Sequence, residues 1–204
     1  MNLASPLRVV LADRNRATRS GIRAAVERAG IAVVAECTDG ASATAAAVRE
    51  RAHVCLIDAD LPGARDAVAA IVSLPLAPKV VVLGSALDEQ AFFAALELGA
   101  AGSLLREVDS TRLGDELRSV AEGGVALAPE LAARLVEDAR RRGRRGRIAP
   151  AGLTDREWEV LGLLADGLTT KEIALRLRVS STTVRRHISS AVERTKRVRV
   201  SEGE

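Results

Sequence analysis

Aromatic residues are almost absent from the chain, which has one Trp, two Phe and no Tyr among its 204 residues. Its cores must therefore be aliphatic, and a hydrophobic content of 48% is enough to build them. No apolar run reaches the roughly 18 residues that a membrane span requires. The first residues also lack the basic segment and apolar stretch of a signal peptide. We therefore expect a cytoplasmic protein with no membrane partner.

Residues that form disulfides or bind metals are also scarce, with two Cys and two His in the chain. Cys37 and Cys55 lie in strand-like runs and are expected to be inert buried thiols. The sequence contains no Ser/His/Asp grouping, no Cys/His metal spacing and no glycine-rich phosphate loop. These absences argue against an enzyme.

The net charge of +3 conceals an uneven distribution along the chain. Residues 1–138 contain 14 basic and 19 acidic residues, a net charge of −5. Residues 139–204 contain 16 basic and 8 acidic residues, a net charge of +8. An acidic N-terminal part and a basic C-terminal part predict that only the C-terminal part of the chain binds a polyanion.

Five strand-like apolar segments alternate with five helix-like segments in the front of the chain. The strands are expected at 7–12, 31–36, 53–57, 79–83 and 101–105, and the helices at 16–29, 41–51, 66–74, 88–98 and 109–122. Continuous apolar strands between helices are typical of a parallel sheet covered on both faces. The fold class is therefore α/β, with a five-stranded doubly wound sheet of the flavodoxin-like kind. In such sheets the functional residues lie at the carboxyl ends of the strands.

A helix and a basic segment separate this front domain from the tail. A helical pattern continues over 129–142, and RRRGRRGR at 140–147 is interrupted by Gly and followed by Pro150. The basic run is either a solvated linker or a supplementary phosphate contact. We place the domains at 1–124, 125–150 and 151–204.

The tail contains three short helices, expected at 154–165, 170–177 and 182–195. Capping boxes open the first two, with Thr154 paired to Glu157 and Thr169 to Glu172. A tight turn joins the second helix to the third, which is polar and basic on one face. This arrangement predicts a helix-turn-helix that binds double-stranded DNA.

The segment LTDREWEVLGLLADGLTTKEIALRLRVSSTTVRRHIS, residues 153–190, resembles the LuxR-type DNA-binding domain. The resemblance implies that Arg185, Arg186 and Ser189 face the bases, and that Lys171, Thr182 and Arg194 contact the backbone. Ser181 and Thr183, at the start of the third helix, complete the candidate DNA-binding set. The chain departs from the family after this point, since RTKRVRVSEGE leaves no amphipathic fourth helix. A monomeric binder and a homodimer formed by the front domain both stay open.

The front domain resembles the receiver domain of NarL/FixJ-class response regulators over residues 7–122. The resemblance lies in the five βα units, in Asp13 after the first strand, in 57–63 (IDADLPG) and in 96–106 (LELGAAGSLLR). It implies that Asp58 accepts a phosphoryl group from a histidine kinase, with Mg²⁺ held by Asp13 and Asp58.

Several residues of this acidic pocket differ from the family pattern. Arg14 replaces the second acid, Gly84 replaces the hydroxyl residue, with Ser85 one position late, and Arg106 replaces the lysine. A charge pair about 4 Å apart is worth on the order of 4 kcal/mol at an effective dielectric near 20, so Arg14 turns attraction for a metal into repulsion. We expect Arg14 to pair with Asp13 or Asp58 instead. A cofactor is then expected only if the receiver is phosphorylated, when it would be Mg²⁺.

Three functions compete. The first is a DNA-binding transcription regulator with a phosphorylation-independent receiver, controlled by dimerisation, a partner protein or a small-molecule ligand. The second is a conventional response regulator phosphorylated on Asp58. The third is a protein-interaction module that binds DNA weakly.

Overall fold

The computed structural model describes residues 6–84, 94–95, 97–106, 110–143 and 153–202. The chain divides into two units, Met1–Ala126 and Leu127–Glu204, which are described separately. Within the described residues, no helix is both long and apolar enough to cross a membrane.

A six-stranded sheet forms the centre of the first unit, in the order β2-β1-β3-β4-β5-β6. The strands are β1 (Arg8–Ala12), β2 (Ala32–Cys37), β3 (Val54–Asp58), β4 (Lys79–Gly84), β5 (Gly102–Leu105) and β6 (Ala126–Leu127). Strands β1 to β5 pair in parallel, as the βα pattern predicts.

The sheet has one strand more than the five predicted from the sequence. The sixth strand, β6, has two residues, and the backbone N–H of Ala126 donates to the carbonyl of Ala101 at 3.0 Å. Gly102 permits this approach, because a Cβ there would lie 1.9 Å from the Ala126 carbonyl oxygen. Two residues are too few to show the periodicity by which strands are recognised in a sequence.

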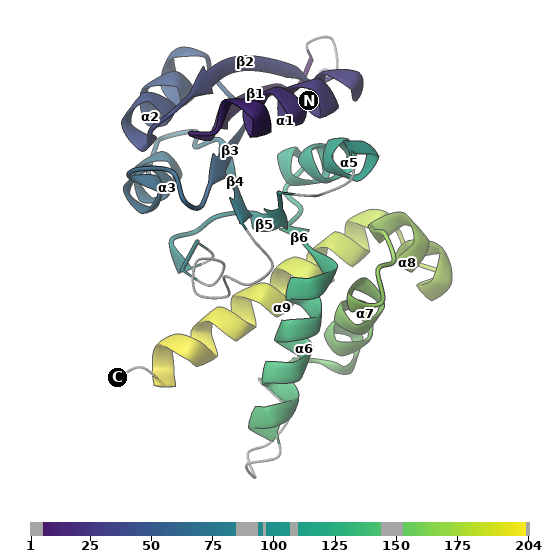
Figure 1. The fold of residues 1–204 in the computed structure, drawn as a ribbon. Helices are drawn as coiled ribbons and strands as arrows, with labels where there is room; N and C mark the ends of the chain where they lie inside the picture. The colour runs from purple at the N-terminus through teal and green to yellow at the C-terminus, as the bar shows by residue number, and fades with distance from the viewer. Residues whose placement is uncertain (1–5, 85–93, 96, 107–109, 144–152, 203–204) are drawn as a thin grey trace. The chain divides into compact units, whose positions relative to one another are not determined.

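Two helices cover each face of the sheet (Figure 1). On one face α1 (Arg16–Arg28) and α5 (Ser110–Ala121) share a core with Val9 and Leu11 of β1 and Leu56 of β3. On the other, α2 (Gly40–Arg49) and α3 (Ala64–Val72) pack over Val10 and Ala12. Burial on both faces explains why the strand sequences are continuously apolar. The helix expected at 88–98 lies largely outside the described residues.

The thiols behave as the sequence predicts. Cys37 and Cys55 are free, buried and part of the aliphatic core beneath α2 and α3. Burial raises the pKa of the Cys55 thiol to about 12, which leaves it protonated and unreactive.

The second unit consists of α6 (Pro129–Gly143), α7 (Asp155–Ala165), α8 (Thr170–Leu177) and α9 (Ser181–Glu202). Helix α6 packs against α7, and both α7 and α8 pack against α9. The buried side chains are aliphatic and include Leu131, Leu135, Val160, Leu161, Leu164, Ile173, Val184, Ile188 and Val192.

Helix α9 is longer than the helix predicted at 182–195. It runs for 22 residues to Glu202 rather than ending at Thr195. No glycine or proline interrupts 196–202, so nothing in the sequence ends the helix there.

Candidate DNA-reading helices and acidic pocket

Both predicted capping boxes are present at the helix starts. The Thr154 N–H donates to Glu157 Oε2 at 2.8 Å, and the Glu157 N–H donates to Thr154 Oγ1 at 3.3 Å. The same exchange joins Thr169 and Glu172 at 2.7 and 3.3 Å. Two amides without intrahelical partners are satisfied at each helix start, which fixes where α7 and α8 begin.

A tight turn connects α8 to α9. Arg178 ends α8 with a left-handed backbone, φ 54°, and the Val179 N–H donates to the Ala174 carbonyl at 3.0 Å. Ser180 then caps α9, since its Oγ accepts from the Thr183 N–H at 3.0 Å. Buried Ile173, Ala174, Val184 and Ile188 hold the two helices together. This geometry is that of a helix-turn-helix.

Most of the predicted DNA-binding residues lie along the first half of α9. Thr182 and Arg186 are exposed, and Ser181, Thr183, Arg185 and Ser189 are half-buried. The Arg185 guanidinium donates to Thr182 Oγ1 at 3.2 Å, and Ser189 Oγ donates to the Arg185 carbonyl at 3.0 Å. Lys171 is exposed in the first turn of α8.

Arg194 has different surroundings from the other members of this set. Its Nε lies 3.2 Å from Oε1 of Glu157, whose side chain is buried in the first turn of α7. Sequence reasoning did not pair these residues, because it treated Arg194 as a surface contact and Glu157 as a cap alone.

The acidic pocket lies at the carboxyl ends of β1 and β3. Asp13 follows β1 and Asp58 ends β3, and both are buried. The Asn15 N–H donates to Asp13 Oδ1 at 2.6 Å, and the Asp60 N–H donates to Asp58 Oδ1 at 3.2 Å. Two carboxylates thus meet where a doubly wound sheet places its functional residues.

Arg106 supplies the cation of this pocket. Its Nη2 donates to Asp58 Oδ1 at 2.5 Å and also to Asp60 Oδ2. Burial raises the pKa of the Asp58 carboxyl, against the opposing effects of the Asp60 N–H and the Arg106 charge. The bond to Asp60 is the main cause that raises the pKa of Arg106. The guanidinium therefore stays charged and bridges the two carboxylates.

Arg14 is not that cation, contrary to the expectation from the sequence. It is exposed, and among the described residues no ion pair joins it to Asp13 or Asp58. Asp13 points inward after β1, whereas Arg14 faces solvent. Asp60 was missed as a member of the pocket, although its position two residues after Asp58 is a signal. Ser85 lies outside the described residues.

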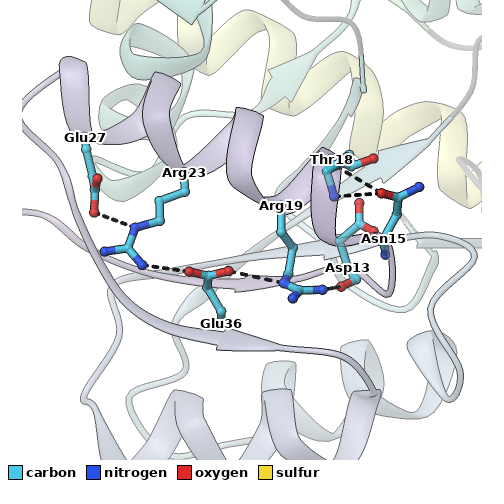
Figure 2. Close-up of polar contacts among 8 residues, drawn as sticks. Asp13, Asn15, Thr18, Arg19, Arg23, Glu27 and Glu36 are labelled. Carbon is cyan, nitrogen blue, oxygen red and sulfur yellow. Dashed lines mark hydrogen bonds and ion pairs between the residues drawn. The ribbon is translucent and has the colours of Figure 1, made fainter.

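Figure 2 shows a chain of charged side chains that holds the Asp13 loop in place. Asn15 caps α1, its Oδ1 accepting from the amides of Ala17 and Thr18 at 2.9 and 3.2 Å. Arg19 donates to the Asp13 carbonyl at 2.8 Å and to Glu36 of β2 at 3.2 Å (Figure 2). The network fixes the pocket loop to α1 and β2.

The residues present do not fit a divalent cation. Mg²⁺ requires near-octahedral oxygen ligands, but one oxygen of Asp58 already accepts from an amide and a guanidinium. Within the described part of the chain, no three His, Cys, Asp or Glu side chains are grouped so that they could hold a metal ion. Arg106 bridges Asp58 and Asp60, so a metal at Asp58 would have to compete with its guanidinium.

Comparisons with known families agree with the two units. The response regulator receiver domain family matches residues 9–118, and the luxR family of bacterial regulatory proteins matches residues 151–196. The transcriptional regulatory protein DesR of Bacillus subtilis (strain 168) is 35% identical over 162 residues, covering 79% of this chain and 76% of DesR. The probable transcriptional regulatory protein NarL of Mycobacterium tuberculosis (strain H37Rv) is 36% identical, with 92% and 87% covered.

Solved structures of response regulators match most of the chain. The response regulator ChrA of a heme-sensing two-component system is 29% identical with a TM-score of 0.56, over 95% of this chain and 98% of ChrA. The response regulator RcsB of Salmonella typhimurium is 25% identical with a TM-score of 0.58, over 94% and 92%. Fold and site thus define a DNA-binding transcription regulator in which a receiver domain precedes a helix-turn-helix. The chain belongs to the response regulators of two-component systems whose DNA-binding domain is of the LuxR family.

Proposed function

We propose that this response regulator controls transcription without phosphorylation of its receiver. The observation that carries the proposal is the bridge from Arg106 to Asp58 and Asp60. Phosphoryl transfer to a carboxylate needs an accessible oxygen and a metal to neutralise the added charge. Here the carboxylate is buried, and a fixed guanidinium already neutralises it.

The output is sequence-specific binding of double-stranded DNA by α9 in the major groove. Arg185, Arg186 and Ser189 read base edges, since Arg donates bidentately to guanine and Ser bonds several bases. Phosphate contacts come from Lys171 and from the start of α9, at Ser181, Thr182 and Thr183. The RcsB structure of similar fold was studied for DNA interaction, which supports this assignment.

The input is a signal other than phosphate and needs no resident cofactor. A partner protein, a small-molecule ligand or homodimerisation through the first unit would each act without a histidine kinase. Asp58, Asp60 and Arg106 then form a fixed ion cluster rather than a site of group transfer.

Intact-mass measurement tests the receiver directly. The purified full chain is incubated with Mg²⁺ and acetyl phosphate, beside a receiver that is known to be labelled. We expect no mass gain. A gain of one phosphoryl group that disappears in Asp58→Asn would instead establish conventional phosphorylation and direct attention to a kinase.

Duplex-DNA titration over a range of salt concentrations tests the output. We expect salt-sensitive binding that is lost in the Arg185→Ala/Arg186→Ala variant. Salt-insensitive or absent binding by the folded wild-type chain would favour a protein-interaction role instead.

A further inference from the structure

Glu157 of α7 and Arg194 of α9 form an ion pair between the two helices. The Glu157 side chain is only 4% exposed, whereas Arg194 is 49% exposed. Glu157 Oε2 accepts from the Thr154 N–H at 2.8 Å, and its Oε1 lies 3.2 Å from Arg194 Nε. Each carboxylate oxygen thus has a different partner, one at the N-cap of α7 and one on α9.

A buried carboxylate is tolerated only when it is paired and hydrogen-bonded. The Thr154 amide and the start of α7 satisfy part of this requirement, because helix N-termini favour negative charge. Among the described residues, Arg194 is the only cation that forms an ion pair with Glu157. Removing its charge would leave Glu157 buried without a counter-ion.

Helical geometry turns Arg194 away from Arg185, one of the proposed base-reading residues. Nine positions separate Arg185 from Arg194, which is about 2.5 turns of an α-helix. The two side chains therefore leave α9 on opposite sides. Next to Arg194 lies the buried face of α9, with Ile188, Ala191, Val192 and Thr195, and α9 packs on α7.

We propose that Arg194 is a positioning residue, not a phosphate contact. Its ion pair with Glu157 fixes the orientation of α9 against α7 and so sets how Arg185 and Arg186 are presented. The effect on DNA binding rests on the proposed function, but the effect on stability does not.

Melting of the full chain, followed by fluorescence, tests the pair. The only Trp of the chain, Trp158, directly follows Glu157 in α7, so its emission reports the second unit. We expect Arg194→Met to lower the Trp158 melting midpoint by about 5 °C or more. Arg194→Lys should restore most of the lost melting midpoint. Glu157→Gln combined with Arg194→Met should restore part of it, because the variant has no buried carboxylate without a counter-ion.

Salt-dependent DNA titration separates positioning from phosphate contact. Each phosphate contact adds about 0.9 to the slope of log K against log salt concentration. Below its melting range, Arg194→Met should bind more weakly by a constant factor at every salt concentration, with the wild-type slope. The matched control Lys171→Met should lose about 0.9 from the slope, whatever its melting midpoint.

Two results would overturn the proposal: an unchanged melting midpoint in Arg194→Met, or a slope lower by about 0.9 in that variant. If Arg194→Met folds too poorly for titration, Arg194→Lys and the double variant carry both measurements. If wild-type protein binds no duplex, the proposed DNA-binding function fails, and the melting series alone decides the role of the pair.

Discussion

Arg106 is the residue on which the state of the receiver pocket depends. Its guanidinium neutralises Asp58 and Asp60 together, so a metal would have to displace it before reaching either oxygen. Arg14 has a different effect, since it lies at the surface in the position of the missing second acid. The two arginines therefore oppose Mg²⁺ binding in different ways. Arg106 pairs with the carboxylates that would bind the ion, and Arg14 replaces an acidic ligand.

Calorimetric Mg²⁺ titration distinguishes these two contributions. Arg14→Asp alone should bind Mg²⁺ no better than the wild-type chain, because Arg106 still bridges the carboxylates. Arg14→Asp combined with Arg106→Ala should create a measurable site, since no guanidinium then bridges Asp58 and Asp60 and a second acid follows Asp13. Equal affinity in the single and double variants would show that Arg106 is no obstacle.

Glu116 of α5 makes the stability of the first unit depend on pH. Burial raises the pKa of its carboxyl to about 7, partly opposed by the charge of Arg112. Between its unfolded pKa of 4.5 and about 7, the folded state binds more protons than the unfolded state. The contribution of Glu116 is therefore complete below the lower value and is lost as the pH rises through the upper one.

Circular-dichroism melts of wild type and Glu116→Gln between pH 5 and 8 measure this loss. Gln keeps the shape of the neutral carboxyl and does not titrate. Relative to the variant, the free energy of unfolding of the wild-type chain should fall by up to about 3 kcal/mol between pH 5 and 8. This figure follows from 1.36 kcal/mol of stability for each unit by which the pKa is shifted. Parallel stability curves would mean that Glu116 is not buried in solution.

At this scale the sequence located the acidic pocket but not its ion pairs. Asp13, Asp58 and Arg106 could be brought together because each directly follows or ends a strand of one parallel sheet. The expected pairing of Arg14 with Asp13 or Asp58 is not seen, because pairing depends on which side of the loop each side chain leaves. Sequence position does not record that direction.

Among the helices and strands, those with local end signals were the best predicted. The capping boxes at Thr154 and Thr169 fixed the starts of α7 and α8, because the same few residues supply all the hydrogen bonds. The two-residue β6 and the extension of α9 had no such signal. Pairing with β5 defines β6. Helix α9 continues to Glu202 because no glycine or proline interrupts 196–202.

The capping box of α8 should affect both folding and DNA binding. Thr169→Ala removes the side chain that accepts from the Glu172 N–H, at a cost of about 1 kcal/mol. Trp158 fluorescence melts should show this loss, and DNA affinity should fall because α8 supports α9. The adjacent Thr170→Ala is the control, since Thr170 lies inside the helix. Equal losses in both variants would argue against the cap.

Charge divides the whole molecule more sharply than its net value suggests. The first unit, residues 1–126, contains 13 basic and 16 acidic residues, a net charge of −3, and the second, residues 127–204, contains 17 and 11, a net charge of +6. The first unit is therefore repelled by the polyanion that the second unit binds. The basic residues at 140–147 add to the positive side of this division.

Comparing the full chain with the fragment 127–204 tests this division of labour. The fragment contains α6 to α9 and their own aliphatic core, and Trp158 melts establish that it is folded. On a short duplex that accepts one protomer, both proteins should give the same slope of log K against log salt concentration, since the slope counts phosphate contacts. The fragment should bind at least as tightly, because the acidic unit no longer repels the duplex. A steeper slope for the full chain would place basic residues of the first unit, such as exposed Arg14, on the phosphates.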